Sequence, residues 1–189
     1  MRERAKSVDD TRQRIVEATV RLHQSVGPAE TTIAAIAAEA GVTRLTVYRH
    51  FPEDESLYYA CSAHWQSRQT PPDPKTWAAV GELEPRLRLG FADIYRFYRA
   101  GQSMLAMIYR DLDLLPAPLR QGILARDDAW CDVLVNGSRS RRLRAAVGHA
   151  VGFATWQSLC LGQGLSDQDA VALMCDLALV ASRPRNSRR

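Results

Sequence analysis

One short stretch of this 189-residue sequence combines guanidinium groups, hydroxyl groups and an aromatic ring on what would be one face of a helix. At about 100° per residue, Leu45, Thr46 and Arg49 point away from Val47 and Phe51. Such a face offers donors to phosphate oxygens, a guanidinium for guanine edges and apolar groups for thymine methyls, without any acid. The pattern predicts contact with double-stranded DNA, and the alternative is the solvated face of an ordinary helical hairpin. The residues that we expect to contact DNA are Thr32, Thr43, Arg44, Leu45, Thr46, Tyr48, Arg49 and His50.

Two short helices separated by a tight turn must position these side chains. Thr32 can cap the first helix with its side-chain oxygen, and apolar residues then recur at helical spacing. Gly41 can end that helix, because glycine adopts the left-handed conformation without strain. Thr43 can cap the second helix at once, and the alanines of the first helix let the second lie close across it. A helix, a short turn and a second helix over residues 32–51 form the arrangement of a helix-turn-helix.

A longer segment around this motif resembles a known family. Residues 11–57 resemble the DNA-binding domain of the TetR/AcrR-type transcriptional regulators, and they cover about the first third of the chain. The resemblance implies an all-helical, homodimeric repressor that responds to a small molecule. The matching residues are 11–18, 31–33, 36–37, 41–44, 47–52, 55 and 57.

Two residues depart from the pattern of that family. Many members carry a lysine that approaches a phosphate where this chain has Asp54, and an aspartate cannot make that contact. Most members have glycine or another small residue at the position of Leu45, which by the angle count points toward the DNA groove. We expect Leu45 either to touch a thymine methyl or to crowd the DNA. These departures leave a second interpretation open, namely a TetR-fold sensor or interaction module with weak or lost DNA binding.

Helical periodicity continues through the rest of the chain without strand-like alternation, which predicts an all-α fold of about nine helices. We expect the DNA-binding domain over residues 9–69, with a connecting helix over 54–69 and a second domain over 76–182. The boundary is a segment over 70–76 that contains three prolines. An arm before the first helix, which would begin near residue 11, carries Arg2, Arg4 and Lys6 and is either a DNA contact or a solvated terminus.

The last two expected helices, over 141–161 and 167–181, are apolar on more than one side. A helix with two apolar faces needs two partners, and one of them can be another chain. The pattern favours a homodimer through this pair of helices, and the alternative is a larger internal core. A dimer also suits the expected function, since two recognition helices related by a two-fold axis read a palindromic operator.

Large aromatic side chains are concentrated in the second domain. In the TetR-type family, helices of this region enclose a cavity for a small effector, and an aromatic lining suits an apolar or aromatic ligand. The alternative for each aromatic residue is an ordinary place in the core. The residues that we expect to line the cavity are Tyr98, Tyr109, Trp130 and Trp156.

Motifs and composition argue against several other classes of protein. The sequence has no phosphate-binding glycine loop, nucleophile elbow or Ser/His/Asp constellation, so we expect neither an enzyme nor a cofactor. Cys61 and His64 lie one helical turn apart, but a closed zinc site needs four ligands and no second pair follows. No apolar run is long enough to cross a bilayer, and the charged N-terminus is unlike a secretory signal, which favours the cytoplasm. The net charge of +4 is compatible with a nucleic-acid partner.

Overall fold

The computed structural model describes residues 2–183, including the side chains of residues 8–53 and 55–183. These residues form eleven α-helices and no strand, so the predicted all-α fold is confirmed, and the helix number is near the expectation of about nine. The chain divides into two compact units, one of Met1–Thr70 with Gly101–Arg120 and one of Pro71–Ala100 with Gln121–Arg189. In the described part of the chain, no helix is both long and apolar enough to cross a membrane.

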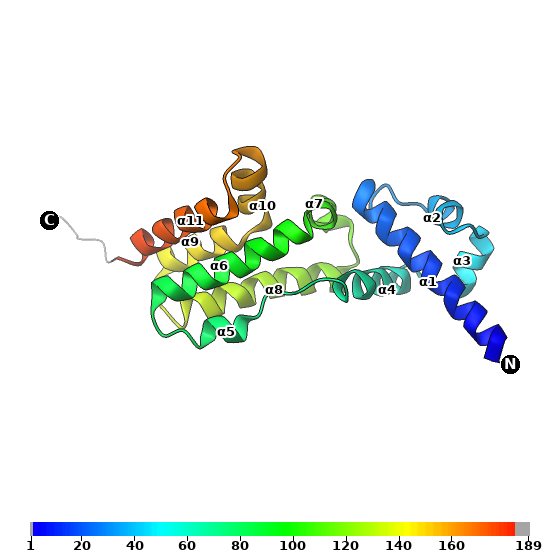
Figure 1. Cartoon of the computed structure of the whole chain (residues 1–189), viewed down its shortest axis with the longest axis horizontal. Coiled ribbons are helices and arrows are strands. Elements are labelled where there is room, and N and C mark those ends of the chain that lie inside the picture. Colours follow the sequence, from blue (N-terminus) through cyan, green and yellow to red (C-terminus); the bar gives the residue numbers. More distant parts are fainter. Residues whose placement is uncertain (1, 184–189) are drawn as a thin grey trace. The chain divides into compact units, whose positions relative to one another are not determined.

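The first unit, called unit 1 below, contains five α-helices and a short 3₁₀ helix: α1 (Arg2–Ser25), α2 (Ile33–Ala40), α3 (Arg44–His50), α4 (Asp54–Gln66), α7 (Gln102–Arg110) and η1 (Leu112–Leu114). Helix α1 packs against α2, α4 and α7, and α2 packs against α3 (Figure 1). Their shared core includes Ile15, Ile36, Val47, Phe51 and Leu57. Helix α1 begins well before the expected start near residue 11. The arm side chains expected at positions 2, 4 and 6 lie outside the described part of the structure.

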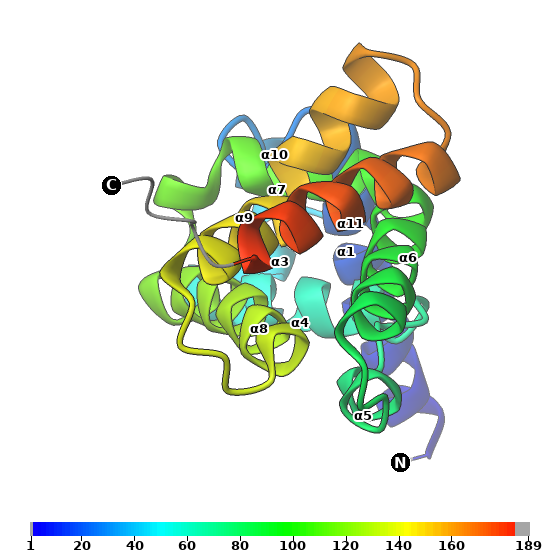
Figure 2. The same ribbon diagram turned by 90° about the vertical axis from the view of Figure 1, so that its left-hand side faces the viewer.

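The second unit, unit 2, is built from the remaining helices: α5 (Pro74–Ala78), α6 (Leu83–Ala100), α8 (Ala117–Val135, which starts in unit 1), α9 (Arg141–Val151), α10 (Phe153–Trp156), the π-helix η2 (Gln157–Gly162) and α11 (Asp167–Ser182). Helix α11 lies beside both α6 and α9 (Figure 2). Helix α5 begins within the proline-containing boundary segment over 70–76, because Asp73 caps it by accepting from the Lys75 N–H and Pro74 occupies its first position.

The prediction of one continuous helix over 141–161 is wrong, because the chain breaks at Gly152. This glycine is extended, with φ −66° and ψ 130°, so the carbonyls before it lose their helical partners. The Tyr95 hydroxyl donates to the Ala150 carbonyl at 2.9 Å, and the Tyr98 hydroxyl donates to the Val151 carbonyl at 2.6 Å. Two side chains of α6 therefore stabilise the break that separates α9 from α10.

We expect Tyr98→Phe to lower the free energy of unfolding by about 1–3 kcal/mol, because it leaves a buried carbonyl without its donor while changing little volume. Urea unfolding followed by circular dichroism measures the cost. Tyr59→Phe is the matched control, since Tyr59 is exposed and should lose almost nothing. Equal stabilities of the two variants would show that the Tyr98 hydroxyl does not hold the break.

Candidate nucleic-acid interface

The turn between α2 and α3 is built by three residues that act locally. The Thr32 Oγ1 accepts from the Ala35 N–H at 3.1 Å and caps α2. Gly41 ends α2 in the left-handed conformation, with φ 65°, and its N–H donates back to the end of the helix. The Thr43 Oγ1 accepts from the Thr46 N–H at 3.2 Å and caps α3. The turn therefore needs only a few residues and holds α3 across α2.

Helix α3 divides cleanly into a buried side and an exposed side. Val47 is fully buried, and Phe51 just after the helix is 3% exposed. On the other side, Leu45 is 77% exposed and Tyr48 is 49% exposed. Arg49 is exposed as well, so this side presents a guanidinium, a phenol and an aliphatic group to the surroundings.

The other residues expected to contact DNA lie on or beside this surface. Thr43 and Arg44 are exposed at the start of α3, and Thr46 is half-buried. The hydroxyls of Thr43 and Thr46 lie 3.0 Å apart, so each already has a partner within the protein. Thr32 is exposed at the start of α2. The structure therefore gathers seven of the expected residues along α3 and its cap, with Thr32 on the neighbouring helix.

His50 lies partly inside rather than fully on this surface. Its Nε2 is buried and has no hydrogen-bond partner among the described residues. Burial lowers the pKa of His50, and the positive charges of Arg49 and Arg12 lower it further. The imidazole is therefore neutral at physiological pH and adds no positive charge for DNA.

Arg12 is a candidate contact that the sequence pattern did not reveal. Its guanidinium lies 4.7 Å from the centre of the Phe51 ring, next to the end of α3. Arg14 on the same helix donates from Nη1 to the Ala40 carbonyl at 3.3 Å and ties α1 to the end of α2. No local signal could identify these roles, because both contacts join segments that are distant in sequence. The side chain of Asp54 lies outside the described part of the structure.

Cys61 and His64, which lie one helical turn apart in sequence, have different hydrogen-bond partners in the structure. The Cys61 Sγ lies 3.5 Å from the Nδ1 of His23 on α1, and His64 instead meets Gln13. Burial raises the pKa of Cys61 to about 12 and lowers the pKa of His23 to about 4. The described residues contain no cluster of three or more potential metal ligands. The pair is a neutral thiol beside a neutral imidazole in the core of unit 1.

The buried His23 predicts acid sensitivity of unit 1. Its pKa in the folded chain lies below its usual value, so the unfolded chain takes up the proton first as pH falls. The neutral His23 side chain makes its full contribution to the free energy of unfolding above its unfolded pKa of about 6.5. This contribution is lost as pH falls toward about 4. Between about pH 7 and pH 5, we expect the free energy of unfolding to fall by about 2 kcal/mol. Urea unfolding at both pH values measures this difference.

Substitution of His23 separates this effect from other titrations. His23→Gln should remove most of the difference between the two pH values, whereas replacement of the exposed His149 by glutamine should leave it unchanged. A pH dependence that survives in His23→Gln would assign the acid sensitivity to another group.

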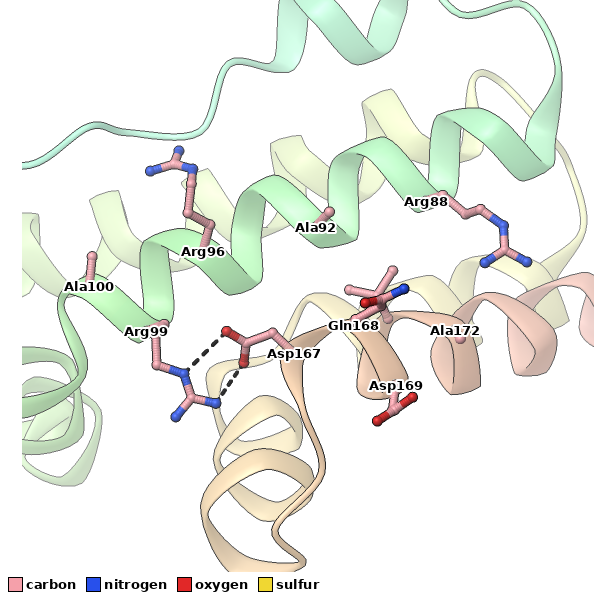
Figure 3. A pocket seen from close by; sticks show the side chains of 10 residues that line it. Arg88, Ala92, Arg96, Arg99, Ala100, Asp167, Gln168, Asp169 and Ala172 are labelled. Carbon is pink, nitrogen blue, oxygen red and sulfur yellow. Dashed lines mark hydrogen bonds and ion pairs between the residues drawn. The ribbon is translucent and has the colours of Figure 1, made fainter.

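A groove on unit 2 lies between α6 and the start of α11 and has a volume of about 700 Å³ (Figure 3). Arg88 and Arg99 lie near opposite ends of the groove, and the carboxylate of Asp169 points away from α6. Arg99 donates to both oxygens of Asp167, at 2.7 and 3.2 Å, and the Trp156 Nε1 donates to Asp167 at 3.0 Å. The rest of the lining consists of Arg96, Gln168 and four small apolar residues: Ala92, Ala100, Val171 and Ala172.

Three of the four aromatic residues expected to line a cavity come together in unit 2. The Tyr98 ring centre lies 6.4 Å from that of Trp130 and 6.0 Å from that of Trp156. All three are buried, and Tyr98 and Trp156 are fully so. Tyr109 lies on α7 in unit 1. The cluster meets the groove through the bond from Trp156 to Asp167.

Comparison with known proteins agrees with this geometry. A family model described as "Bacterial regulatory proteins, tetR family" matches residues 15–61, which run from the middle of α1 into α4. The "HTH-type transcriptional regulator SrpR" of Pseudomonas putida is 36% identical over 88 residues. That match covers 42% of this chain, and the chain spans only 40% of the length of that relative.

A solved structure extends the likeness to the whole fold. A TetR-like transcriptional regulator from Rhodococcus sp. RHA1 superposes with a TM-score of 0.66 over 92% of this chain and 97% of that chain, at 18% sequence identity. At this identity the likeness concerns the fold. The family model matches the segment that contains α2, the turn and α3. Residues 15–61 therefore match the tetR family of bacterial regulatory proteins, and the chain shares the fold of a TetR-like regulator.

Proposed function

We propose that this chain is a homodimeric repressor that binds a palindromic DNA operator and is released from it by a small molecule. The observation that carries the proposal is the outward side of α3, where Tyr48 and Arg49 are exposed while Val47 anchors the helix from behind. A short helix held this way can enter the major groove with its polar side toward the bases. The proposal assigns no catalytic activity, and a DNA-binding regulator of this kind acts in the cytoplasm.

The exposed side chains of α3 take different roles in this proposal. Arg49 reads a base edge, because its guanidinium is exposed and can form two hydrogen bonds with guanine. Tyr48 and Arg12 contact phosphates, which fixes the register of the protein without reading sequence. Leu45 touches a thymine methyl group. Thr43 and Thr46 mainly maintain the cap of α3, because they already bond to one another.

The dimer is proposed to form through α9 and α11. Leu173, Leu177 and Val180 recur along α11 and remain 46%, 43% and 55% exposed in the single chain. Exposed Ala145 and Gly148 on the neighbouring α9 would let another helix approach closely. Apolar side chains repeated on one side of a helix are typical of a protein contact, and a two-fold dimer gives the spacing that a palindrome requires.

We expect Leu177→Glu to convert the dimer to a monomer and to weaken binding to a palindromic operator by at least about tenfold, since two half-sites no longer bind together. Sedimentation equilibrium measures the first effect and fluorescence anisotropy the second. Leu124→Glu is the matched control, because Leu124 is an equally exposed leucine on α8. A dimer that survives Leu177→Glu would contradict this interface.

The effector is proposed to bind in unit 2, as an apolar or aromatic molecule with a polar group. The groove between α6 and α11 has space for a small molecule, and its alanines and valine supply apolar contacts. A ligand there would meet the Arg99–Asp167 pair, which connects to Trp156 and so to the aromatic cluster around Tyr98. If binding favours the form with low DNA affinity by about 1–3 kcal/mol, operator affinity falls roughly 5- to 150-fold.

A gel-shift experiment tests the proposal with the full chain and the DNA that flanks its own gene. We expect a discrete shifted band whose affinity falls steeply as salt rises, because arginines displace counterions from phosphates. A band competed away by the flanking DNA but not by unrelated DNA supports an operator. Absence of any shift at low salt would favour the second interpretation, a sensor or interaction module of the same fold.

A further inference from the structure

The turn between α1 and α2 determines how the helix-turn-helix leaves the long first helix. Gly27 in this turn is buried and has φ 92°, a conformation that favours glycine. The Thr31 Oγ1 donates to the Gly27 carbonyl at 2.7 Å, just before α2 begins. The orientation of α2, and of α3 packed on it, therefore depends on the geometry of a few residues.

The end of α7 holds this turn from outside through two adjacent residues. The Asp111 carboxylate, 6% exposed, accepts from the Ala29 N–H at 3.0 Å. Arg110 donates to both oxygens of Asp111, at 2.7 and 2.9 Å, and its Nη2 also donates to the Val26 carbonyl at 2.8 Å. Asp111 thus binds the turn by accepting from a backbone N–H, and Arg110 binds it by donating to a backbone carbonyl.

The fit between this pair and the turn leaves no room for a side chain at position 27. A Cβ on Gly27 would lie 2.2 Å from the Arg110 Nη2 and 2.6 Å from the Asp111 Oδ2. The hydrogen bonds from Arg110 and from the Ala29 N–H lower the pKa of Asp111, although burial of the carboxyl group acts in the opposite direction. The carboxylate is therefore charged at physiological pH and remains a strong acceptor.

We infer that Arg110 and Asp111 are positioning residues that fix the α1–α2 turn and thereby set how α3 is presented to DNA. This inference rests on the proposed function, because it concerns the regulation of the same DNA-binding surface. Helix α7 follows α6 directly through Gly101, and α6 forms one wall of the groove of unit 2. Helix α7 is therefore joined covalently to a wall of the groove and by hydrogen bonds to the turn, so it connects the two in addition to the connecting helix α4.

The start of α7 is also fixed within unit 1. A Cβ on Gly101 would lie 2.8 Å from the Trp65 ring of α4, so the backbone packs closely there. Helix α7 is thus held against α4 at one end and against the α1–α2 turn at the other. A displacement of α7 changes the turn through two hydrogen bonds that a shift of about 1 Å would break.

The test compares Asp111→Ala and Arg110→Ala with Arg120→Ala in the full chain. Arg120 is the matched control, because its guanidinium pairs with Asp113 near the same segment. Hydrogen exchange of the Ala29 amide and of α2 and α3 is the first readout. The second is the ratio of affinities for the duplex that the wild-type chain selects from a random library and for a shuffled duplex.

We expect Asp111→Ala to speed exchange of the Ala29 amide and of α2 and α3, and to lower the affinity ratio roughly tenfold. Asp111→Asn should recover part of the ratio, since its side-chain oxygen can still accept from Ala29. Arg110→Ala combined with Asp111→Ala should cost little more than Asp111→Ala alone, because the two residues act as a unit. Arg120→Ala should behave as wild type.

The outcomes separate this inference from the proposed function. Unchanged exchange in α2 and α3 in Asp111→Ala, or an affinity ratio equal to that of Arg120→Ala, would overturn the positioning role. A wild-type chain that selects no duplex would contradict the proposed function. In that case, faster exchange of α2 and α3 in Asp111→Ala would still support control of the helix-turn-helix geometry by this pair.

Discussion

Replacement of Arg86 by leucine should lower the free energy of unfolding by about 3 kcal/mol, because hydrogen bonds to charged groups contribute about 1.5–3 kcal/mol each and leucine makes none of them. Arg86 is only 4% exposed, and its guanidinium has carbonyl partners instead of a carboxylate. The Nε donates to the Leu134 carbonyl at 3.0 Å, and the Nη1 donates to the carbonyls of Val80 and Gly81 at 2.7 and 3.0 Å. One side chain thus joins the start of α6 to the end of α8 and to the loop after α5.

The matched control for this substitution is Arg88→Leu, two positions further along the same helix. Arg88 is exposed and pairs with Glu84 one turn before it, and such surface pairs contribute about 0.3–0.5 kcal/mol. Urea unfolding should therefore separate the variants clearly, with Arg86→Lys between them because an ammonium cannot reach all three carbonyls. A cost below about 0.5 kcal/mol for Arg86→Leu would mean that relaxation or water satisfies the carbonyls.

Arg49→Ala should remove about 1–3 kcal/mol of discrimination at one base pair of each half-site while leaving the fold intact. Arg49 is exposed on α3, and neither its carbon chain nor its guanidinium supports the core around Val47. Tyr48→Ala should instead weaken binding to all duplexes alike, because a phosphate contact carries no sequence information.

Competition between the selected duplex and its single-base variants measures this discrimination. Arg21→Ala is a suitable control, since Arg21 is an exposed arginine of the same unit that pairs with Glu39 at 2.7 Å. It should change neither affinity nor preference by more than about twofold. If Arg49→Ala lowers affinity equally for every duplex, Arg49 contacts phosphate and another residue of α3 reads the base.

The helix-turn-helix could be predicted from sequence because its determinants are local. Thr32, Gly41 and Thr43 act on amides and carbonyls within a few residues of themselves, so their spacing alone defines the two helices. The exposed side of α3 followed in the same way from helical geometry around Val47. The partial burial of His50 could not be predicted in this way, because its Nε2 is buried among neighbours that the helical angle does not describe.

The remaining features depend on contacts between distant parts of the chain. The break at Gly152 is stabilised by Tyr95 and Tyr98, whose hydroxyls bond to carbonyls 55 and 53 positions away. The contact of Asp111 with Ala29 spans 82 positions. Helical periodicity places both tyrosines on the apolar side of α6, which agrees with the burial of their rings. It contained no information about where their hydroxyls would donate.

Selection of duplexes from a random library by the wild-type chain is the most direct test of DNA recognition by α3. The proposal predicts enrichment of an inverted repeat whose half-sites lie about one helical turn apart, as expected for two copies of α3 related by a two-fold axis. It also predicts that Arg49→Ala enriches a less defined sequence at one position of each half-site. Enrichment of no sequence, by a chain that remains folded, would contradict the assignment of this protein as an operator-binding repressor.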